Sequence, residues 1–481
     1  MSAAMESWSF PPSYDDDYFP EAGSRYWFPH RETIPAAERE AAILGRLQEL
    51  CAYAYANAPF YRRKWDEVGF HPSMLKSLED FESRVPVVTK AELRASQTAN
   101  PPFGDYLCVP ESEVFHVHGT SGTTGRPTAF AIGANDWRAI ANAHARIMWG
   151  MGMRPGDTIC VAAIFSLYMG SWGALAGAER LRAKSFPFGA GAAGMSARCA
   201  QWLDLLKPTA FYGTPTYALH LAQTAVDNGL DPRGFGLRTM FFSGEPGASI
   251  PAVRGKIEEL YGAKVFDCGS MGEMTPWMNV AGSAETDGML CWQDIVYTEV
   301  CDPTNFHRVP YGSRGTPVYT HMERNSQPMI RLLSGDLTLW EDGPNPCGRT
   351  YPRLPLGIIG RIDDMFTVRG ENVYPSEIDA VLNEMPGYGG EHRIIITREG
   401  TMDELAVRVE ADDEVWREGD ARVRVFEHSV AASLQKLLGL RAVIEILPQH
   451  SIERTDFKAR RVIDDREVLR DMRERLDRKA S

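Results

Sequence analysis

The sequence predicts an α/β protein in which a large N-terminal domain of layered α/β sheets precedes a small C-terminal α+β domain. The chain of 481 residues is longer than one hydrophobic core supports, so at least two domains are expected. Hydrophobic residues make up 44% and charged residues 24%, the balance of a globular protein. Between residues 137 and 265, helical stretches alternate with short apolar segments, which is typical of helices layered on a largely parallel sheet.

The N-terminal elements can be placed in order. Residues 36–60 carry apolar side chains at helical spacing and predict an amphipathic helix that ends at Pro59. From Phe115 to Ile132 the pattern changes to a short strand, a loop of glycines and hydroxylated residues, and a second apolar segment. Strands of the parallel sheet are expected at 158–164, 210–212 and 239–242.

The chain changes character after the expected parallel sheet. Short strands and turns are expected over 289–340, and a smaller, charge-rich unit follows Arg361. Within that unit the pattern indicates one helix near 423–438 and strands at 393–397, 405–410 and 442–447. We therefore place the domain boundary at Asp363, which gives domains of residues 1–362 and 363–481.

Charge and composition narrow the expected partners and compartment. The formal net charge of -13 repels nucleic acid and anionic lipid, so neither a nucleic acid nor a membrane is expected as a partner. The start of the chain has no basic segment followed by an apolar run, and the longest apolar stretch, 158–169, is too short to cross a bilayer. The eight cysteines form no CxxC motif, which argues against a disulfide framework or a clustered zinc site. A reducing cytoplasm is the expected location.

The segment His118-Gly-Thr-Ser-Gly-Thr-Thr-Gly-Arg-Pro-Thr128 has the composition of a phosphate-binding loop. Its glycines let backbone N–H groups approach a polyphosphate, and its hydroxyls can bond the phosphate oxygens. The loop is not that of a phosphate-loop kinase or GTPase, because Arg126 and Pro127 stand where Lys and Ser or Thr would open a helix. A glycine-rich turn without a ligand is the alternative for this segment alone. The expected phosphate contacts are Ser121, Gly122, Thr123, Thr124 and Gly125.

Several further motifs stand in a fixed order along the chain. They are Gly213-Thr-Pro-Thr-Tyr-Ala218, Ser243-Gly-Glu-Pro246, Gly269-Ser-Met-Gly-Glu273, Ser334-Gly-Asp336, Gly360-Arg-Ile-Asp-Asp364 and Arg454-Thr-Asp-Phe-Lys458. Together with the glycine-rich loop, this order resembles the adenylate-forming superfamily and, within it, the phenylacetate:CoA ligase group. The resemblance runs from about residue 53 to the C-terminus. It implies an AMP-forming acid:CoA ligase that uses ATP, CoA and Mg²⁺.

The resemblance assigns nucleotide contacts to separate motifs. Asp336 is expected to accept hydrogen bonds from the two ribose hydroxyls, a geometry that a carboxylate suits, and Arg361 adds a ribose or phosphate contact. The loop of Gly244, Glu245 and Pro246 follows an apolar strand and is expected to lie against the adenine ring. A turn aspartate and a surface salt bridge are the structural alternatives for Asp336 and Arg361.

The two residues expected to act on the phosphates are Glu273 and Lys458. Glu273 would hold Mg²⁺, a cation that prefers one or two carboxylates together with substrate phosphate. Gly272 stands where the family pattern has a hydroxyl, and a helix-capping role is the alternative for Glu273. Lys458 alone would be interpreted as part of a solvated basic face. The resemblance instead implies that it stabilises charge between the acid and the α-phosphate.

The resemblance also implies a small, mobile C-terminal domain. This domain is expected to rotate about the hinge residue Asp363 after adenylation, which withdraws Lys458 and brings the segment around Gly370 to the pantetheine arm of CoA. The thiolate then attacks the acyl-adenylate. Some relatives hold a structural zinc through cysteines, but the corresponding span of this chain lacks the ligands, so no zinc is expected.

The acid substrate is predicted from the side chains near two strand ends. Phe165, Tyr168, Tyr212 and Gly213 offer apolar and aromatic walls for a flat ring, although core packing would use the same residues. An aryl or arylacetic acid, such as phenylacetate or indoleacetate, is therefore the expected substrate. A carrier-protein thiol as acceptor and a non-catalytic nucleotide-binding relative are the alternatives. The sequence leaves the oligomeric state open, with a homodimer among the options.

Overall fold

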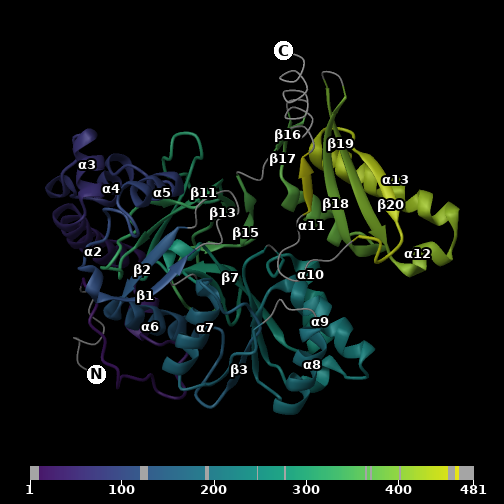
Figure 1. Cartoon of the computed structure of the whole chain (residues 1–481), viewed down its shortest axis with the longest axis horizontal. Helices are drawn as coiled ribbons and strands as arrows, with labels where there is room; N and C mark the ends of the chain where they lie inside the picture. Colours follow the sequence, from purple (N-terminus) through teal and green to yellow (C-terminus); the bar gives the residue numbers. More distant parts are fainter. Residues whose placement is uncertain are drawn as a thin grey trace. The chain divides into compact units, whose positions relative to one another are not determined.

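A computed structural model describes residues 10–464 except 120–127, 190–193, 246, 276–277, 363–365, 369–370, 400–401 and 453–460. The chain divides into two compact units, Met1–Ile358 and Ile359–Ser481, each with its own hydrophobic core (Figure 1). Within the described ranges, no helix combines the length and apolarity that a membrane crossing requires.

The first unit is built around an eight-stranded sheet with the order β14-β9-β8-β7-β6-β5-β3-β4. Its parallel strands are β3 (Thr158–Val161), β4 (Lys184–Phe186), β5 (Ala210–Gly213), β6 (Thr239–Phe242) and β7 (Lys264–Gly269). Antiparallel strands extend it: β8 (Val280–Ser283), β9 (Thr286–Cys291) and β14 (Arg353–Leu354). Strands β5 and β6 are buried along their whole length, as expected for central parallel strands covered on both faces.

Helices connect the parallel strands. They are α7 (Met169–Arg180), α8 (Met195–Leu206), α9 (Pro215–Asp227) and α10 (Pro251–Tyr261). Helix α9 shows why such a helix begins where it does: Thr214 accepts a hydrogen bond from the backbone N–H of Tyr217, and Pro215 fits the first helical position. The alternation of helices and strands predicted from the sequence is confirmed.

A hairpin precedes this sheet. Strands β1 (Val114–Gly119) and β2 (Ala129–Gly133) pair antiparallel, and α6 (Ala134–Gly150) follows directly. Helix α6 packs closely on α7, because a Cβ atom at Gly177 would lie 2.5 Å from the Cβ of His144. Only a glycine permits that distance between the two helices.

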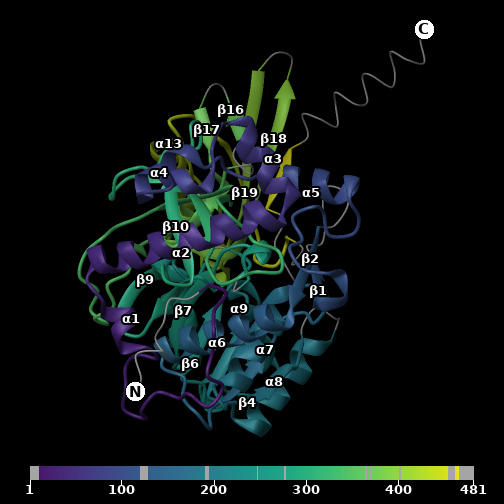
Figure 2. The same cartoon turned by 90° about the vertical axis from the view of Figure 1, so that its left-hand side faces the viewer.

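A second, smaller sheet of the first unit contains β10 (Val296–Cys301), β11 (Arg314–His321), β12 (Leu332–Leu333) and β13 (Asp336–Leu339). The N-terminal helices are α1 (Pro29–Thr33), α2 (Ala36–Asn57), α3 (Pro59–Glu67), α4 (Leu78–Arg84) and α5 (Lys90–Ala99). Helix α2 runs across the front in Figure 2 and buries a stripe at helical spacing, comprising Ile43, Leu47, Leu50, Cys51 and Ala54. The predicted amphipathic helix is confirmed, and it ends at Asn57 because a residue before proline is disfavoured in a helix.

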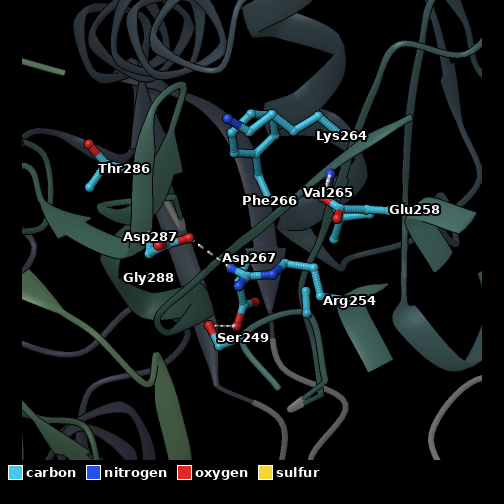
Figure 3. Close-up of a pocket in the computed structure, with 11 residues that line it drawn as sticks. Ser249, Arg254, Glu258, Lys264, Val265, Phe266, Asp267, Thr286, Asp287 and Gly288 are labelled. Carbon is cyan, nitrogen blue, oxygen red and sulfur yellow. Dashed lines mark hydrogen bonds and ion pairs between the residues drawn. The ribbon is translucent and has the colours of Figure 1, made fainter. Parts of the chain in front are cut away.

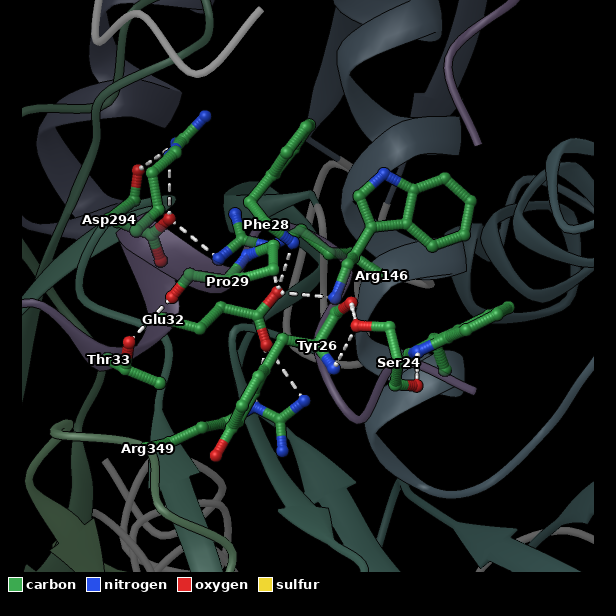
Figure 4. A network of polar contacts seen from close by, with 12 residues as sticks. Ser24, Tyr26, Phe28, Pro29, Glu32, Thr33, Arg146, Asp294 and Arg349 are labelled. Atoms are coloured by element: carbon green, nitrogen blue, oxygen red, sulfur yellow. Dashed lines mark hydrogen bonds and ion pairs between the residues drawn. The ribbon is translucent and has the colours of Figure 1, made fainter. Parts of the chain in front are cut away.

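A buried network of charges ties the N-terminal segment to the body of the first unit (Figure 4). The Glu32 carboxylate lies 3.2 Å from Nε of Arg146 and 2.8 Å from Nη2 of Arg349. Arg146 also reaches Asp294, with Nη2 2.7 Å from Oδ2. Although burial raises the pKa of Asp294, the positive charges of Arg146 and Arg31 outweigh it and the pKa is lowered. Each buried charge of the network is therefore compensated by an opposite charge, and removing one would leave its partners buried without compensation.

The second unit is an α+β domain. Its sheet has the order β20-β19-β18-β21, formed by β18 (Tyr388–Glu399), β19 (Met402–Ala411), β20 (Val443–Leu447) and β21 (Val462–Asp464). The remaining elements are β16 (Phe366–Val368), β17 (Glu371–Val373), α11 (Pro375–Asn383), α12 (Asp413–Arg417) and α13 (Asp420–Leu438). Strand β15 (Ile358–Arg361) spans the boundary between the units. Helix α13 buries Phe426, Val430 and Leu434, one turn apart, in the core shared with the sheet.

Candidate active site

Part of the predicted site lies outside the residues that the structure describes. These positions are Ser121, Gly122, Thr123, Thr124 and Gly125 of the glycine-rich loop, Pro246, the hinge Asp363, Gly370 and Lys458. The remaining predicted residues, and the segments that flank the loop and Lys458, can be placed.

The two ends of the glycine-rich loop are held by the hairpin of β1 and β2. A Cβ atom at Gly119 would lie 2.8 Å from the carbonyl oxygen of Thr128, so the two flanks approach closely at a glycine. The backbone N–H of Gly119 donates to the carbonyl of Leu167 over 3.1 Å. The residue before the loop is thereby bonded to the segment that the sequence predicts to bind the acid.

The nucleotide motif follows β6 and turns at a glycine. Gly244 has a φ of +91°, a conformation that side chains rarely adopt. The Glu245 carboxylate accepts a hydrogen bond of 2.8 Å from the backbone N–H of Thr216, in the first turn of α9. A carboxylate is favoured at a helix N-terminus, so the Glu245 side chain fixes this loop on α9.

Asp336 stands at the start of β13 and is 6% exposed. Its backbone N–H donates to the hydroxyl of Ser334 over 3.0 Å, and Gly335 between them has a φ of +75°. Burial and, to a smaller extent, the charge of Asp336 raise the pKa of Tyr319. Arg361 ends β15.

Glu273 is 1% exposed and lies in a single helical turn, Gly272–Met274. Arg324 holds the turn by donating to the carbonyl of Glu273 over 2.8 Å. The carboxylate oxygen Oε1 lies 3.4 Å from Nζ of Lys90, at the start of α5, whereas Oε2 has no hydrogen-bonding partner in the described part of the chain. A buried carboxylate with one oxygen left over fits a Mg²⁺ ion shared with substrate phosphates.

The partner Lys90 was not foreseen from the sequence. The helix that carries it is fixed by a capping box in which Thr89 and Glu92 bond each other's backbone N–H groups. That Ser/Thr-x-x-Glu spacing could have located the helix, but not the pairing of Lys90 with Glu273. The lysine supplies a positive charge beside a carboxylate that would otherwise be buried alone.

A second residue missed by the sequence analysis is Asp267, near the end of β7 (Figure 3). It borders a cavity of about 220 Å³ and accepts a hydrogen bond of 2.5 Å from the hydroxyl of Ser249. Burial raises the pKa of Asp267 to about 6. Because Asp267 pairs with Phe242, the residue before Ser243, it lies beside the nucleotide motif at the carboxyl edge of the parallel strands.

Three hydroxyl groups meet where the acid was predicted to bind. The phenol oxygen of Tyr212 lies 2.8 Å from Oγ of Ser243 and 3.2 Å from the phenol oxygen of Tyr168. The phenol oxygen of Tyr168 in turn lies 3.4 Å from Oγ of Ser243. Gly170 makes this arrangement possible, because a Cβ atom there would lie 2.4 Å from the Tyr168 ring. A Cβ atom at Gly244 would lie 3.9 Å from the Tyr168 oxygen. The structure therefore joins the predicted acid residues Tyr168 and Tyr212 to the nucleotide motif.

The other two predicted acid residues have different surroundings. Phe165 meets Trp172 edge-on, with ring centroids 5.4 Å apart, and both line an apolar cavity of about 570 Å³. Gly213 ends β5, and a Cβ atom there would lie 3.0 Å from the ring of Phe211. The predicted aromatic wall is thus divided between an apolar cavity and a cluster of hydroxyl groups.

The segment that carries Lys458 is anchored on both sides within the second unit. Before it, the backbone N–H of Ile452 donates to the Glu410 carboxylate over 2.7 Å. After it, Arg461 lies 2.8 Å from Glu391 and 3.2 Å from Asp379, and its carbonyl accepts from a strand of the sheet. These anchors fix where the Lys458 segment leaves and rejoins the sheet.

An α/β domain with the predicted nucleotide motifs at its strand ends, followed by a small α+β domain, is the arrangement of the adenylate-forming enzymes. A family model described as AMP-binding enzyme matches residues 71–318, and one described as AMP-binding enzyme C-terminal domain matches residues 370–466. The phenylacetate-coenzyme A ligase of Thermus thermophilus is 33% identical over 450 residues, covering 91% of this chain and 98% of the relative. The chain therefore belongs to the AMP-binding enzyme family, in the group of the phenylacetate-coenzyme A ligases.

Solved structures are similar over nearly the whole chain. A crystal structure of 2-hydroxyisobutyryl-CoA ligase in the postadenylation state, in complex with R3-HIB-AMP, is 70% identical with a TM-score of 0.93 and covers 99% of this chain and 100% of its own. The same ligase in complex with 2-HIB-AMP and CoA in the thioesterification state is 71% identical with a TM-score of 0.75, with the same coverage.

Proposed function

We propose that this protein is an AMP-forming ligase that joins a small 2-hydroxy carboxylic acid, 2-hydroxyisobutyrate or a close analogue, to coenzyme A through an acyl-adenylate. The observation that carries the substrate proposal is the cluster of Tyr168, Tyr212 and Ser243 hydroxyls beside the nucleotide motif. The 70% identity to a 2-hydroxyisobutyryl-CoA ligase over nearly the whole chain supports it.

The chemistry of the cluster favours a substrate with its own hydroxyl. Each phenol or alcohol can donate one hydrogen bond and accept others, so a hydroxyl on the carbon beside the carboxylate can join the network. A site with buried hydrogen-bonding groups discriminates strongly against an analogue that lacks the matching hydroxyl, because its polar groups then lose their partners. The hydroxyl cluster therefore disfavours a plain hydrocarbon group at that position.

An aryl or arylacetic acid is the second candidate. The names of relatives such as the Thermus thermophilus enzyme support it, and so does the apolar cavity of about 570 Å³ beside Phe165 and Trp172. In that case the ring would enter the apolar cavity and leave the hydroxyl cluster unused. A comparison of acids that differ in these two features separates the candidates.

We assign the nucleotide to residues from several strand ends. We assign the ribose to Asp336 with Arg361, the triphosphate to the glycine-rich loop, and the adenine ring to the loop of Gly244 and Glu245. Asp267, one strand away, would accept a hydrogen bond from the adenine amino group. Glu273 would hold Mg²⁺, which offsets the negative charge of the phosphates when it is bound.

The reaction then proceeds in two steps. A carboxylate oxygen of the acid attacks the α-phosphorus while Lys458 stabilises the developing charge, and pyrophosphate leaves. Rotation of a C-terminal domain of residues 363–481 about Asp363 withdraws Lys458 and presents the Gly370 segment to CoA. The CoA thiolate attacks the acyl carbon and AMP leaves. CoA, rather than a carrier protein, is the proposed acceptor.

A substrate panel tests this proposal. The purified protein would receive Mg²⁺-ATP, CoA and one of three acids: 2-hydroxyisobutyrate, its analogue trimethylacetate with a methyl in place of the hydroxyl, or phenylacetate. Pyrophosphate release and thioester formation would be measured. We expect kcat/KM to be highest for 2-hydroxyisobutyrate and at least about tenfold lower for trimethylacetate. A higher value for phenylacetate would overturn the substrate proposal in favour of the aryl acid.

A further inference from the structure

A buried histidine beside the glycine-rich loop has no role in the chemistry described so far. His118 lies next to the last residue of β1, and its side chain is 4% exposed. Among the described residues, neither of its ring nitrogens has a hydrogen-bonding partner. Leaving a buried polar group without a partner is unfavourable, so such a group calls for a binding or catalytic explanation.

The imidazole is held in one orientation and in its neutral form. Its ring is parallel to that of Trp137, with centroids 6.1 Å apart, and lies 6.3 Å from the ring of Trp172. Burial and, to a smaller extent, the neighbouring His116 lower the pKa of His118 to about 4. At neutral pH the ring therefore offers one N–H donor and one acceptor nitrogen.

The surroundings of His118 connect the two halves of the candidate site. His118 pairs with Phe130 across the hairpin, so the two side chains share one face. A Cβ atom at Gly272, the residue before Glu273, would lie 3.7 Å from the Phe130 ring. On the other side, Trp172 contacts Phe165 in the segment predicted to bind the acid. His118 thus lies on the hairpin face that it shares with Phe130, and its ring neighbours Trp172, which contacts the acid segment.

We propose that His118 donates a hydrogen bond from its ring N–H to the carboxyl group of the acid, at the oxygen that becomes the acyl carbonyl of the adenylate. This inference rests on the proposed acid activation. A neutral donor orients the carboxylate for its attack on the α-phosphorus without cancelling its negative charge. His118 keeps its proton throughout: the other carboxylate oxygen forms the new P–O bond, and later the C–O bond to AMP breaks as the C–S bond forms.

The experiment compares three variants by pyrophosphate release, with separate titrations of acid and ATP. His118→Phe keeps a flat ring for the aromatic stack but has no donor, whereas His118→Gln restores an N–H near the same place. His116→Phe is the matched control, because His116 stacks on Trp137 with centroids 4.0 Å apart in the same strand. Thermal unfolding of each variant reports whether the fold is intact.

We expect His118→Phe to lower kcat/KM for the acid by roughly 10- to 100-fold while KM for ATP changes less than about threefold. His118→Gln should recover a large part of the loss, and His116→Phe should behave like the native protein. The inference is overturned if His118→Phe matches His116→Phe, if ATP is affected as much as the acid, or if His118→Gln is as impaired as His118→Phe. Should the phenylalanine variant not fold, the acid-versus-ATP comparison in the glutamine variant decides.

The test of His118 does not depend on which acid is the substrate. The variants are measured with whichever acid the native protein uses best in the panel. If that acid is phenylacetate, the proposal of a 2-hydroxy acid fails, whereas an acid-specific loss in His118→Phe still supports the role of His118.

Discussion

Removing one hydroxyl from the cluster should change which acid is preferred. In Tyr212→Phe the fully buried phenol, 2.8 Å from Ser243 and 3.2 Å from Tyr168, loses only its oxygen. A buried polar partner left without its hydrogen bond costs about 1–3 kcal/mol. Since 1.36 kcal/mol corresponds to a factor of ten in rate, kcat/KM for 2-hydroxyisobutyrate should fall roughly 5- to 150-fold. Trimethylacetate has no hydroxyl that could bond the cluster, so kcat/KM for this acid should change by less than about threefold.

Pyrophosphate release is measured with each of the two acids separately, for the native protein and for the variant. Tyr261→Phe is the matched control, because Tyr261 is also a buried tyrosine whose hydroxyl makes one hydrogen bond, to the carbonyl of Ala218 over 2.7 Å. That variant should lose stability without changing the ratio of the two acids. Equal losses for both acids in Tyr212→Phe would refute the assignment of the cluster to the substrate hydroxyl.

Four other variants each alter one residue of the candidate site, of the Lys458 segment or of the buried charge network. Glu273→Gln should lower adenylation by on the order of 10²-fold and raise the Mg²⁺ concentration needed for half-maximal AMP formation; an unchanged Mg²⁺ titration would exclude a metal role. Because burial raises the pKa of the Asp267 carboxyl to about 6, ATP affinity should improve as the pH rises through 6. Asp267→Asn should abolish this pH dependence. If the dependence persists in that variant, another group is responsible for it. Arg461→Met should slow adenylation roughly 10- to 100-fold but leave the rate of CoA transfer from pre-made acyl-adenylate near native. The same result is expected for Lys458→Ala, because both residues act through the same segment. Equal losses in both half-reactions would contradict this. Glu32→Gln should lower the free energy of unfolding in urea by about 3–5 kcal/mol, because two buried arginines lose a charged partner, and a change below about 1 kcal/mol would show that the network is not cooperative.

Much of the fold could be predicted from the sequence because its signals are local. The alternation of apolar strands and helices defines the parallel sheet, and Pro59 marks the end of the first long helix. The family resemblance likewise depended on short motifs whose residues are adjacent in the chain. Such patterns require only local sequence.

The pairing of distant side chains could not be predicted in the same way. Tyr168, Tyr212 and Ser243 come together because β5 and β6 are neighbours in the sheet and Tyr168 precedes α7, which is a property of strand order. From the sequence, the aromatic character of Tyr168 and Tyr212 predicts an aryl acid. Their hydroxyls face one another, which became visible only in three dimensions. The same holds for the ion pair between Lys90 and Glu273.

In the proposed mechanism, the acid is activated by attack of its carboxylate on the α-phosphate. The most direct test uses 2-hydroxyisobutyrate labelled with ¹⁸O in both carboxyl oxygens, together with Mg²⁺-ATP and CoA, and mass spectrometry of the products. Adenylation predicts one ¹⁸O atom in AMP, none in pyrophosphate and one in the acyl group of the thioester. Label in inorganic phosphate together with ADP would show an acyl-phosphate route and contradict the account.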